Sequence, residues 1–344
     1  MKTQYANAVT QYENGTSLGG RIIKEGGLVV FPTETVYGLG ANGLNSEAVL
    51  KIFAAKGRPA DNPLILHIAK KSELKPLWSH VPDNARILAD TFWPGPLTMI
   101  FNRSSIVPDE VTAGLDTVAV RMPLNKTARA LINAAGVPIA APSANLSGKP
   151  SPTTAEHVRQ DMDGRVDLII DGGPCKYGLE STVVSLIGRP TILRPGAVTK
   201  EMLEAVIGPV DVAHAVLSPL REGETAASPG MKYRHYAPDA EVVVGEGRER
   251  EIAAKICREY DAREAAGEYC IIFATKQTQP FYRGRNCVII GDRTEPATLC
   301  ASLFYSLREY GGRADVIFAE ALPNDDMGLA YMNRLLRSAG FNII

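Results

Sequence analysis

Short apolar runs, bounded by glycine, proline and small polar residues, recur through the first part of this chain. Because β-branched and aromatic residues are frequent in these runs, they predict buried β-strands. We expect strands at 28–31, 64–68, 97–101, 118–120, 138–141, 167–171 and 191–194. Helical spacing of apolar residues between them predicts helices before residue 26, after residue 45, at 83–91 and at 126–135. The pattern indicates an α/β domain.

The pattern becomes more regular toward the C-terminus. Predicted strands at 240–244, 269–274, 287–290 and 315–319 alternate with predicted helices at 249–265, 295–310 and 328–338. This alternation predicts a small open parallel sheet with Rossmann-like winding. No GxGxxG motif follows its first strand, so dinucleotide binding is not indicated.

Proline and glycine interrupt the region between these two parts, which is too long for a simple turn. We therefore expect two domains, at 1–208 and 239–344, joined by a linker at 209–238. The end of the linker combines tyrosines with cations and prolines, and flexible tethers do not need tyrosines. This end of the linker is therefore expected to dock on another surface, which the pattern does not identify.

Composition excludes several classes of protein. The formal net charge of −1 gives no sign of a large nucleic-acid-binding surface. The five cysteines include no CxxC pair, which argues against a zinc site or a disulfide framework and favours a reducing cytoplasm. The N-terminus lacks the apolar core of a signal peptide, and no apolar run approaches transmembrane length.

Four cations lie where an anion could be bound. Lys56 falls on the apolar face of the helix after residue 45, and Arg58 follows it closely. Arg121 and Arg194 each end a predicted buried strand, where an arginine is costly unless it is paired or faces a cleft. Together they predict a concave site for oxyanions. For Lys56 alone, a snorkelling side chain that complements the helix C-terminus is the other interpretation.

Hydroxyl-rich segments follow two of the strands. Residues 33–37 carry three hydroxyls and Glu34, which is either a substrate or Mg²⁺ group or a structural residue. Gly38, Gly40 and Gly43 come next, and we expect them to take positive φ or to approach a ligand. The loop 142–148 suits an anion, but it also reads as a turn with a helix cap at Ser151 or Thr153. His67, in an apolar strand, is either a core residue or a ligand.

Several motifs now occur in a specific order. A K-x-R element lies at Lys56–Arg58 and an S-x-N element at Ser143–Asn145, and PTET-VYGL, NPL, PSANLSG, STVV, RPG and SPGM-YRHYAP accompany them. With these motifs the chain resembles the long, two-domain form of the threonylcarbamoyl-AMP synthase family, which is built on a YrdC-type domain. The resemblance implies a YrdC-like twisted mixed sheet with helices and a basic concave cleft, followed by a smaller Rossmann-like parallel α/β domain. It also implies that the linker is an active-site lid.

The resemblance implies a reaction in which ATP, L-threonine and bicarbonate or CO2 give L-threonylcarbamoyladenylate and pyrophosphate. This is the first step of the N6-threonylcarbamoyladenosine modification of tRNAs that read ANN codons, and a separate threonylcarbamoyl-transferase complex completes it. Mg²⁺ is expected to enter with ATP, with no organic cofactor. A cytoplasmic protein is expected, with no membrane partner and no stable nucleic-acid binding.

The resemblance also implies residue roles. The catalytic group is Lys56, Arg58, Ser143 and Asn145. L-Threonine is expected at Thr35, His67, Arg121, Ala141 and Ser181. ATP is expected at Arg58, Asn62, Thr117, Ser143, Ser151, Arg194 and the linker residue Tyr236. No protein ligand to Mg²⁺ is assigned, because phosphates and water hold this ion readily.

Two alternatives stay open. One is a related carbamoyltransferase that acts through a carbamoyl-adenylate, although its zinc-finger-like cysteine pairs and acylphosphatase-like segment are absent here. The other is a module that binds tRNA or double-stranded RNA, against which the net charge and the lack of a basic, aromatic-interleaved face both count.

Overall fold

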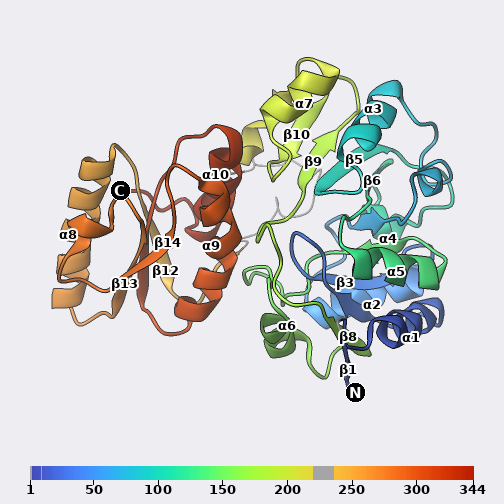
Figure 1. Ribbon diagram of the computed structural model, residues 1–344, viewed down its shortest axis with the longest axis horizontal. Coiled ribbons are helices and arrows are strands. Elements are labelled where there is room, and N and C mark those ends of the chain that lie inside the picture. Colours follow the sequence, from blue (N-terminus) through green and yellow to red (C-terminus); the bar gives the residue numbers. More distant parts are fainter. Residues whose placement is uncertain (1, 9, 220–235) are drawn as a thin grey trace. The chain divides into compact units, whose positions relative to one another are not determined.

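The computed structural model describes residues 2–8, 10–219 and 236–344 (Figure 1). It divides into two compact units, one formed by residues 1–147 and 151–232 and the other by residues 148–150 and 233–344. The described helices include none that is both long and apolar enough to cross a membrane.

The first unit is built on a mixed sheet. Within the described residues, eleven strands follow the order β1-β8-β2-β3-β7-β4-β6-β5-β9-β10-β11. Their bounds are β1 Gln4–Asn7, β2 Val29–Phe31, β3 Gly38–Asn42, β4 Ile65–His67, β5 Leu97–Asn102, β6 Thr117–Arg121, β7 Ile139–Ala141, β8 Leu168–Asp171, β9 Thr182–Ser185, β10 Thr191–Arg194 and β11 Asp211–Val212. Strand β6 runs parallel to β4 and antiparallel to β5, so the predicted mixed sheet is confirmed.

Helices cover both faces of this sheet. They are α1 Tyr12–Lys24, α2 Ser46–Lys56, α3 Asp83–Phe92, α4 Asp109–Thr112, α5 Lys126–Ala135, α6 Ala155–Met162 and α7 Lys200–Ile207, with short 3₁₀ turns at Lys71–Leu74 and His214–Val216. Side chains of α2, α3, α6 and α7 enter one core cluster, and those of α1 and α5 enter another. Neighbouring residues such as Ala140 and Ala141 of β7 belong to different clusters, as alternation along a strand requires.

Strands β1 and β3 were not predicted, and the positive φ expected as one role of the three glycines at 38, 40 and 43 is wrong. Gly38, Gly40 and Gly43 do not have positive φ. A Cβ on Gly40 would lie 2.7 Å from Ile139 Cγ2 and 2.8 Å from Phe31 Cε1. The glycines of β3 therefore make room for the Phe31 ring and its neighbours. The predicted cap of α6 is also wrong, because Thr154 caps this helix by accepting a hydrogen bond from the His157 backbone N–H.

The second unit confirms the predicted parallel α/β domain. Strands β12 Glu241–Gly245, β13 Cys270–Thr275, β14 Cys287–Gly291 and β15 Val316–Glu320 form a parallel sheet in the order β12-β15-β13-β14. Helices α8 Glu249–Ala265, α9 Pro296–Gly311 and α10 Asp326–Ser338, with a 3₁₀ turn at Gln279–Tyr282, connect the strands.

Part of the predicted linker belongs to the first sheet. Strand β11 lies within 209–238, and it pairs in parallel with β10 through Thr191–Asp211 and Ile192–Val212. The sheet therefore extends past residue 208. Residues 220–235, which include most of the expected lid, lie outside the described residues.

Candidate active site

One face of the sheet carries residues from both substrate sets. Arg121 lies directly opposite His67 of β4 and Thr98 of β5, and directly paired residues point to the same face. Thr117 shares this face at the other end of β6, about 13 Å away at the usual rise of about 3.3 Å per residue. Arg121 and His67 of the predicted threonine set and Thr117 of the predicted ATP set therefore lie on one face of the sheet.

A small apolar cluster of strand side chains lies between Arg121 and Thr117. Ile65, Ile100, Ala119 and Val183 come from β4, β5, β6 and β9, and Leu193 of β10 packs against them. Their neighbours Leu66 and Val120 enter the large core on the opposite face. The cluster is a fixed apolar floor between Arg121 and Thr117.

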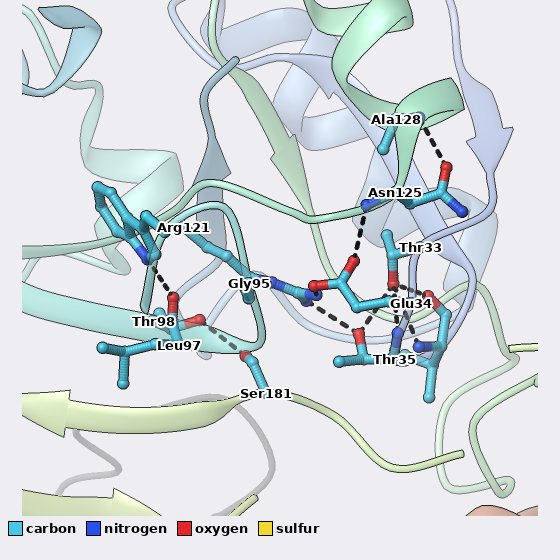
Figure 2. A network of polar contacts seen from close by, with 12 residues as sticks. Thr33, Glu34, Thr35, Gly95, Leu97, Thr98, Arg121, Asn125, Ala128 and Ser181 are labelled. Atoms are coloured by element: carbon cyan, nitrogen blue, oxygen red, sulfur yellow. Dashed lines mark hydrogen bonds and ion pairs between the residues drawn. The ribbon is translucent and has the colours of Figure 1, made fainter. Parts of the chain in front are cut away.

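Arg121 is held at the end of β6 by a buried network (Figure 2). Its Nη2 lies 2.6 Å from Oε1 of Glu34, its Nη1 donates to Thr35 Oγ1 at 2.9 Å, and its Nε donates to the Gly95 carbonyl at 3.4 Å. The second Glu34 oxygen accepts from the backbone N–H of Asn125 at 3.2 Å, immediately before α5. The guanidinium is therefore fixed before any substrate arrives.

Opposing effects set the charge of Glu34. Burial alone would raise the pKa of its carboxyl, but the charge and hydrogen bond of Arg121 outweigh burial and hold the pKa below its usual range. Glu34 is therefore a carboxylate at neutral pH, and its structural interpretation is the one that the geometry supports.

The hydroxyl of Thr35 has a definite orientation. The Thr33 hydroxyl donates to the carbonyl oxygen of Val36 at 2.6 Å, and the two threonine hydroxyls lie 2.8 Å apart. Thr35 Oγ1 therefore donates to Thr33 while it accepts from Arg121. A chain of hydrogen bonds thus links residues 33–37 to β6.

A second strand-end arginine, Arg194, is hydrogen-bonded to the residue that directly precedes β9. Arg194 ends β10, and its Nε donates to the Ser181 carbonyl at 3.1 Å while Nη2 reaches Ser181 Oγ at 3.3 Å. The same hydroxyl lies 2.7 Å from Thr98 Oγ1 (Figure 2). Because Thr98 pairs with Arg121 in the sheet, Ser181 connects the two strand-end arginines.

His67 is buried beside Arg121. Burial and, second, the positive charge of Arg121 lower its pKa to about 3, so the imidazole is neutral at physiological pH. Its Nδ1 lies 3.2 Å from the Ile65 carbonyl, which can only accept, so Nδ1 carries the proton. Ala141, at the end of β7, pairs with Ile65 on the same face.

Lys56 binds the loop that carries the S-x-N element. Its Nζ donates to the carbonyl oxygens of Ser143 and Asn145, at 2.6 Å each, and approaches Asn145 Oδ1 at 3.5 Å. The Ser143 hydroxyl donates to Asn145 Oδ1 at 2.6 Å, and the Asn145 amide donates to the Leu146 carbonyl at 2.8 Å. The K-x-R and S-x-N elements thus meet, as expected.

Arg58 and Asn62 lie together after α2. Arg58 stacks over the Phe53 ring at 5.3 Å, and its Nη2 donates to the Asn62 carbonyl at 3.4 Å. The side chain of Asn62 is fully buried, yet within the described part of the chain neither its amide nitrogen nor its amide oxygen has a hydrogen-bond partner. A buried amide without partners costs about 1–3 kcal/mol, so a group that meets it on binding is favoured.

Two further residues of the predicted ATP set have described contacts of their own. Ser151 is buried and donates to Glu180 Oε1 at 2.6 Å. Tyr236 belongs to the second unit, where its ring packs on Phe304 at 4.9 Å.

Sequence reasoning did not assign Glu180 at all, although its position directly before Ser181 was a signal. The described residues include no group of three or more histidine, cysteine or acidic side chains that could hold a metal ion.

These features define an α/β protein with arginines and hydroxyls along one sheet face, a type of site suited to anionic substrates. The Sua5_yciO_yrdC family, described as Telomere recombination, matches residues 21–196, and the family described as Threonylcarbamoyl-AMP synthase, C-terminal domain, matches residues 198–340.

Full-length relatives agree with this result. Proteins named threonylcarbamoyl-AMP synthase from Bacillus subtilis (strain 168) and Pyrococcus abyssi (strain GE5 / Orsay) are each 47% identical over 94% of this chain, and cover 92% and 93% of their own lengths. The crystal structure of P. abyssi Sua5 complexed with L-threonine matches with a TM-score of 0.93 at 44% identity, over 100% of this chain and 99% of the other. The chain belongs to the threonylcarbamoyl-AMP synthase family.

Proposed function

We propose that this protein is an enzyme, a nucleotidyltransferase that makes L-threonylcarbamoyladenylate from L-threonine, bicarbonate or CO2, and ATP, with release of pyrophosphate. The observation that carries this proposal is the 47% identity to two threonylcarbamoyl-AMP synthases over both domains. Formation of this product would be the first step of the N6-threonylcarbamoyladenosine modification of tRNAs that read ANN codons.

The fixed guanidinium of Arg121 supports a site for the threonine carboxylate. Arginine has five N–H donors in a planar fork, and the contacts to Glu34, Thr35 and Gly95 use three of them. A held fork binds a carboxylate with little loss of side-chain entropy. The proposed contacts of L-threonine are Thr35, His67, Arg121, Ala141 and Ser181, and the proposal is supported by the fold shared with the relative described as complexed with L-threonine.

ATP is proposed to extend from the S-x-N loop along the sheet face. Its predicted contacts are Arg58, Asn62, Thr117, Ser143, Ser151, Arg194 and Tyr236. The partnerless amide of Asn62 supports this placement, because ligand binding would supply its missing hydrogen bonds. The distance of about 13 Å from Thr117 to Arg121 suits two substrates that lie end to end.

The chemistry then needs alignment and positive charge. The threonine amine forms a bond to the carbon of CO2 and gives up a proton; with bicarbonate, a C–O bond breaks and the amine proton leaves with that oxygen as water. An oxygen of the resulting carbamate then attacks the α-phosphorus as its bond to pyrophosphate breaks. Every reacting group except the amine is anionic or becomes so. Arg58 and the second amide N–H of Asn145 are held donors that favour this charge without reorganisation, with Ser143 orienting that amide and Lys56 behind them.

Mg²⁺ is proposed to enter with ATP. The described residues offer no cluster of three acidic, histidine or cysteine side chains, so the donor set fits an ion held mainly by ATP phosphates and water. When bound, Mg²⁺ would neutralise charge on the phosphates. No protein residue is assigned to hold it.

The proposed setting is the cytoplasm. We expect no membrane partner and no stable binding to nucleic acid. Transfer of the threonylcarbamoyl group to tRNA is expected to require a separate enzyme complex.

Detection of the product tests this function. Purified protein is incubated with ATP, Mg²⁺, L-threonine and ¹³C-bicarbonate, and the mixture is analysed by mass spectrometry. A threonylcarbamoyl-adenylate that carries one heavy carbon is expected. An adenylate of unlabelled mass, or no adenylate at all, would overturn the assignment.

A further inference from the structure

Buried groups of opposite charge hold the loop 142–148 from two sides. Lys56 is the last residue of α2, and Asp161 lies near the end of α6. Each is only 2% exposed. Buried charges need polar partners. The contacts of Lys56 and Asp161 therefore indicate which groups each side chain holds in place.

Lys56 binds carbonyl oxygens of this loop. Two of them, from Ser143 and Asn145, lie 2.6 Å from Nζ, and Asn145 Oδ1 lies at 3.5 Å. An ammonium has three N–H donors, and two of them form short bonds to carbonyl oxygens of this loop. Lys56, which was expected to help bind an oxyanion, is thus engaged with the loop.

Asp161 binds the same peptide group from its other end. Its Oδ2 accepts the Leu146 backbone N–H at 3.1 Å. The Asn145 carbonyl and the Leu146 N–H belong to one planar peptide unit and point in opposite directions. A cation therefore lies at the negative end of this peptide dipole and an anion at its positive end, an arrangement that we call the peptide clamp.

Two further bonds complete the support of the loop. The Ala144 N–H donates to the Tyr37 carbonyl at 2.9 Å, and the Ser147 N–H donates to the Lys56 carbonyl at 3.0 Å. The backbone on both sides of Ser143 and Asn145 is thereby fixed. Carbonyl oxygens would repel phosphate, but the carbonyl oxygens of Ser143 and Asn145 are bound by Lys56.

We propose that Lys56 and Asp161 are positioning residues, which clamp the Asn145–Leu146 peptide and so orient Ser143 and Asn145 toward ATP. Lys56 then acts through the loop and does not touch the one-carbon substrate. This inference rests on the proposed function, because it concerns the loop that the function places at the nucleotide. Asp161 has no role in the residue sets predicted from the sequence.

Hydrogen exchange of the substrate-free protein, together with steady-state kinetics, tests the clamp. The variants are Lys56→Met and Asp161→Asn, each of which removes one charge at similar size. In both, we expect the amides of residues 144–147 to exchange at least ~10-fold faster and kcat to fall about 100-fold, while KM for bicarbonate changes less than ~3-fold.

Matched controls lie on the same helices. Lys51 of α2 donates to the Gly26 carbonyl at 2.7 Å, so Lys51→Met also removes a lysine hydrogen bond to backbone. Glu156 of α6 is exposed and pairs with Arg159 at 3.6 Å, so Glu156→Gln removes an acidic group outside the loop. Neither control is expected to change loop exchange or kcat.

Unchanged loop exchange in Lys56→Met, with a selective rise in KM for bicarbonate, would overturn the inference in favour of direct contact. If Lys56→Met does not fold, Asp161→Asn decides, and wild-type loop exchange and kcat in that variant would overturn the clamp. Failure of the proposed function looks different, because the wild-type protein would then form no product while its loop exchange would still respond to both substitutions.

Discussion

Nη2 of Arg121 lies 2.6 Å from Oε1 of Glu34, and both side chains are almost completely buried. Burying two charges is costly, so such a pair is weak support for stability as such, but loss of one partner typically costs about 3–5 kcal/mol. The two residues are 87 positions apart in the sequence. Their contact fixes the arginine that is proposed to bind the threonine carboxylate.

Replacement of Glu34 is therefore expected to weaken threonine binding more than ATP binding. Arg121 and the Asn125 N–H bind different oxygens of Glu34, and in Glu34→Gln one of these oxygens becomes an NH2 group that cannot accept, so one of the two contacts loses its acceptor. We expect KM for threonine to rise about 10-fold, equivalent to about 1.4 kcal/mol, with KM for ATP nearly unchanged. Steady-state kinetics measure both, and Glu47→Gln on the exposed start of α2 is the control. Equal rises in the two KM values would contradict a positioning role.

Replacement of Asn62 is expected to weaken ATP binding without destabilising the fold. Leucine has a similar size and no polar atoms, so Asn62→Leu removes an amide that is buried without partners. We expect the free energy of unfolding to stay the same or to rise, because no hydrogen bond is lost. KM for ATP is expected to rise about 10-fold or more, since a missing hydrogen bond to substrate costs about 1–2 kcal/mol. Urea unfolding that shows clear destabilisation would count against this account.

His67 is expected to make the fold sensitive to acid. Its pKa is about 3 when folded, against an ordinary value near 6.5, so the unfolded chain takes up the proton first as the pH falls. As the pH falls from about 6.5 to about 3, His67 should lower the free energy of unfolding by about 1.4 kcal/mol for each pH unit. Above about pH 6.5 it should have no effect.

Urea unfolding at a series of pH values measures this effect. The slope of stability against pH should be shallower in His67→Gln than in the wild-type protein over the same window. Parallel slopes would show that His67 is not held neutral.

Gly40 tests the packing role of the glycines in β3. A Cβ at this position would lie 2.8 Å from the Phe31 ring and 2.7 Å from Ile139, so Gly40→Ala overfills a closed space. Overpacking typically costs about 1–3 kcal/mol. Thermal unfolding measures the loss, and Gly312→Ala is the control because nothing lies within 4 Å of its added methyl group. A Gly40→Ala variant as stable as the wild-type protein would contradict the packing argument.

The strength of local patterns explains what the sequence could predict. In the second unit, apolar strands alternate with helices, and the predicted elements match β12 to α10 to within about two residues, the usual uncertainty of element ends. Strand β3 was missed because glycine is depleted in strands, and here only packing against Phe31 explains it. Strand β1, with the sequence QYAN, carries no clear apolar alternation.

The candidate site divides in the same way. Arg121 and Arg194 could be predicted, because an arginine that ends a buried strand is unusual in any sequence. The partners of Arg121 and Lys56 could not be predicted, since they depend on sheet register and on loops far apart in the chain. The motifs identified the candidate residues, and the three-dimensional structure was needed to show that Lys56 contacts a loop and Arg121 a carboxylate.

Pyrophosphate release under omission of single substrates tests the central claim most directly. The account predicts release only when ATP, L-threonine and bicarbonate are all present, because adenylation requires the carbamate that threonine and the one-carbon substrate form together. Omission of any one should reduce the rate to background. Pyrophosphate released at the same rate without threonine would contradict the account.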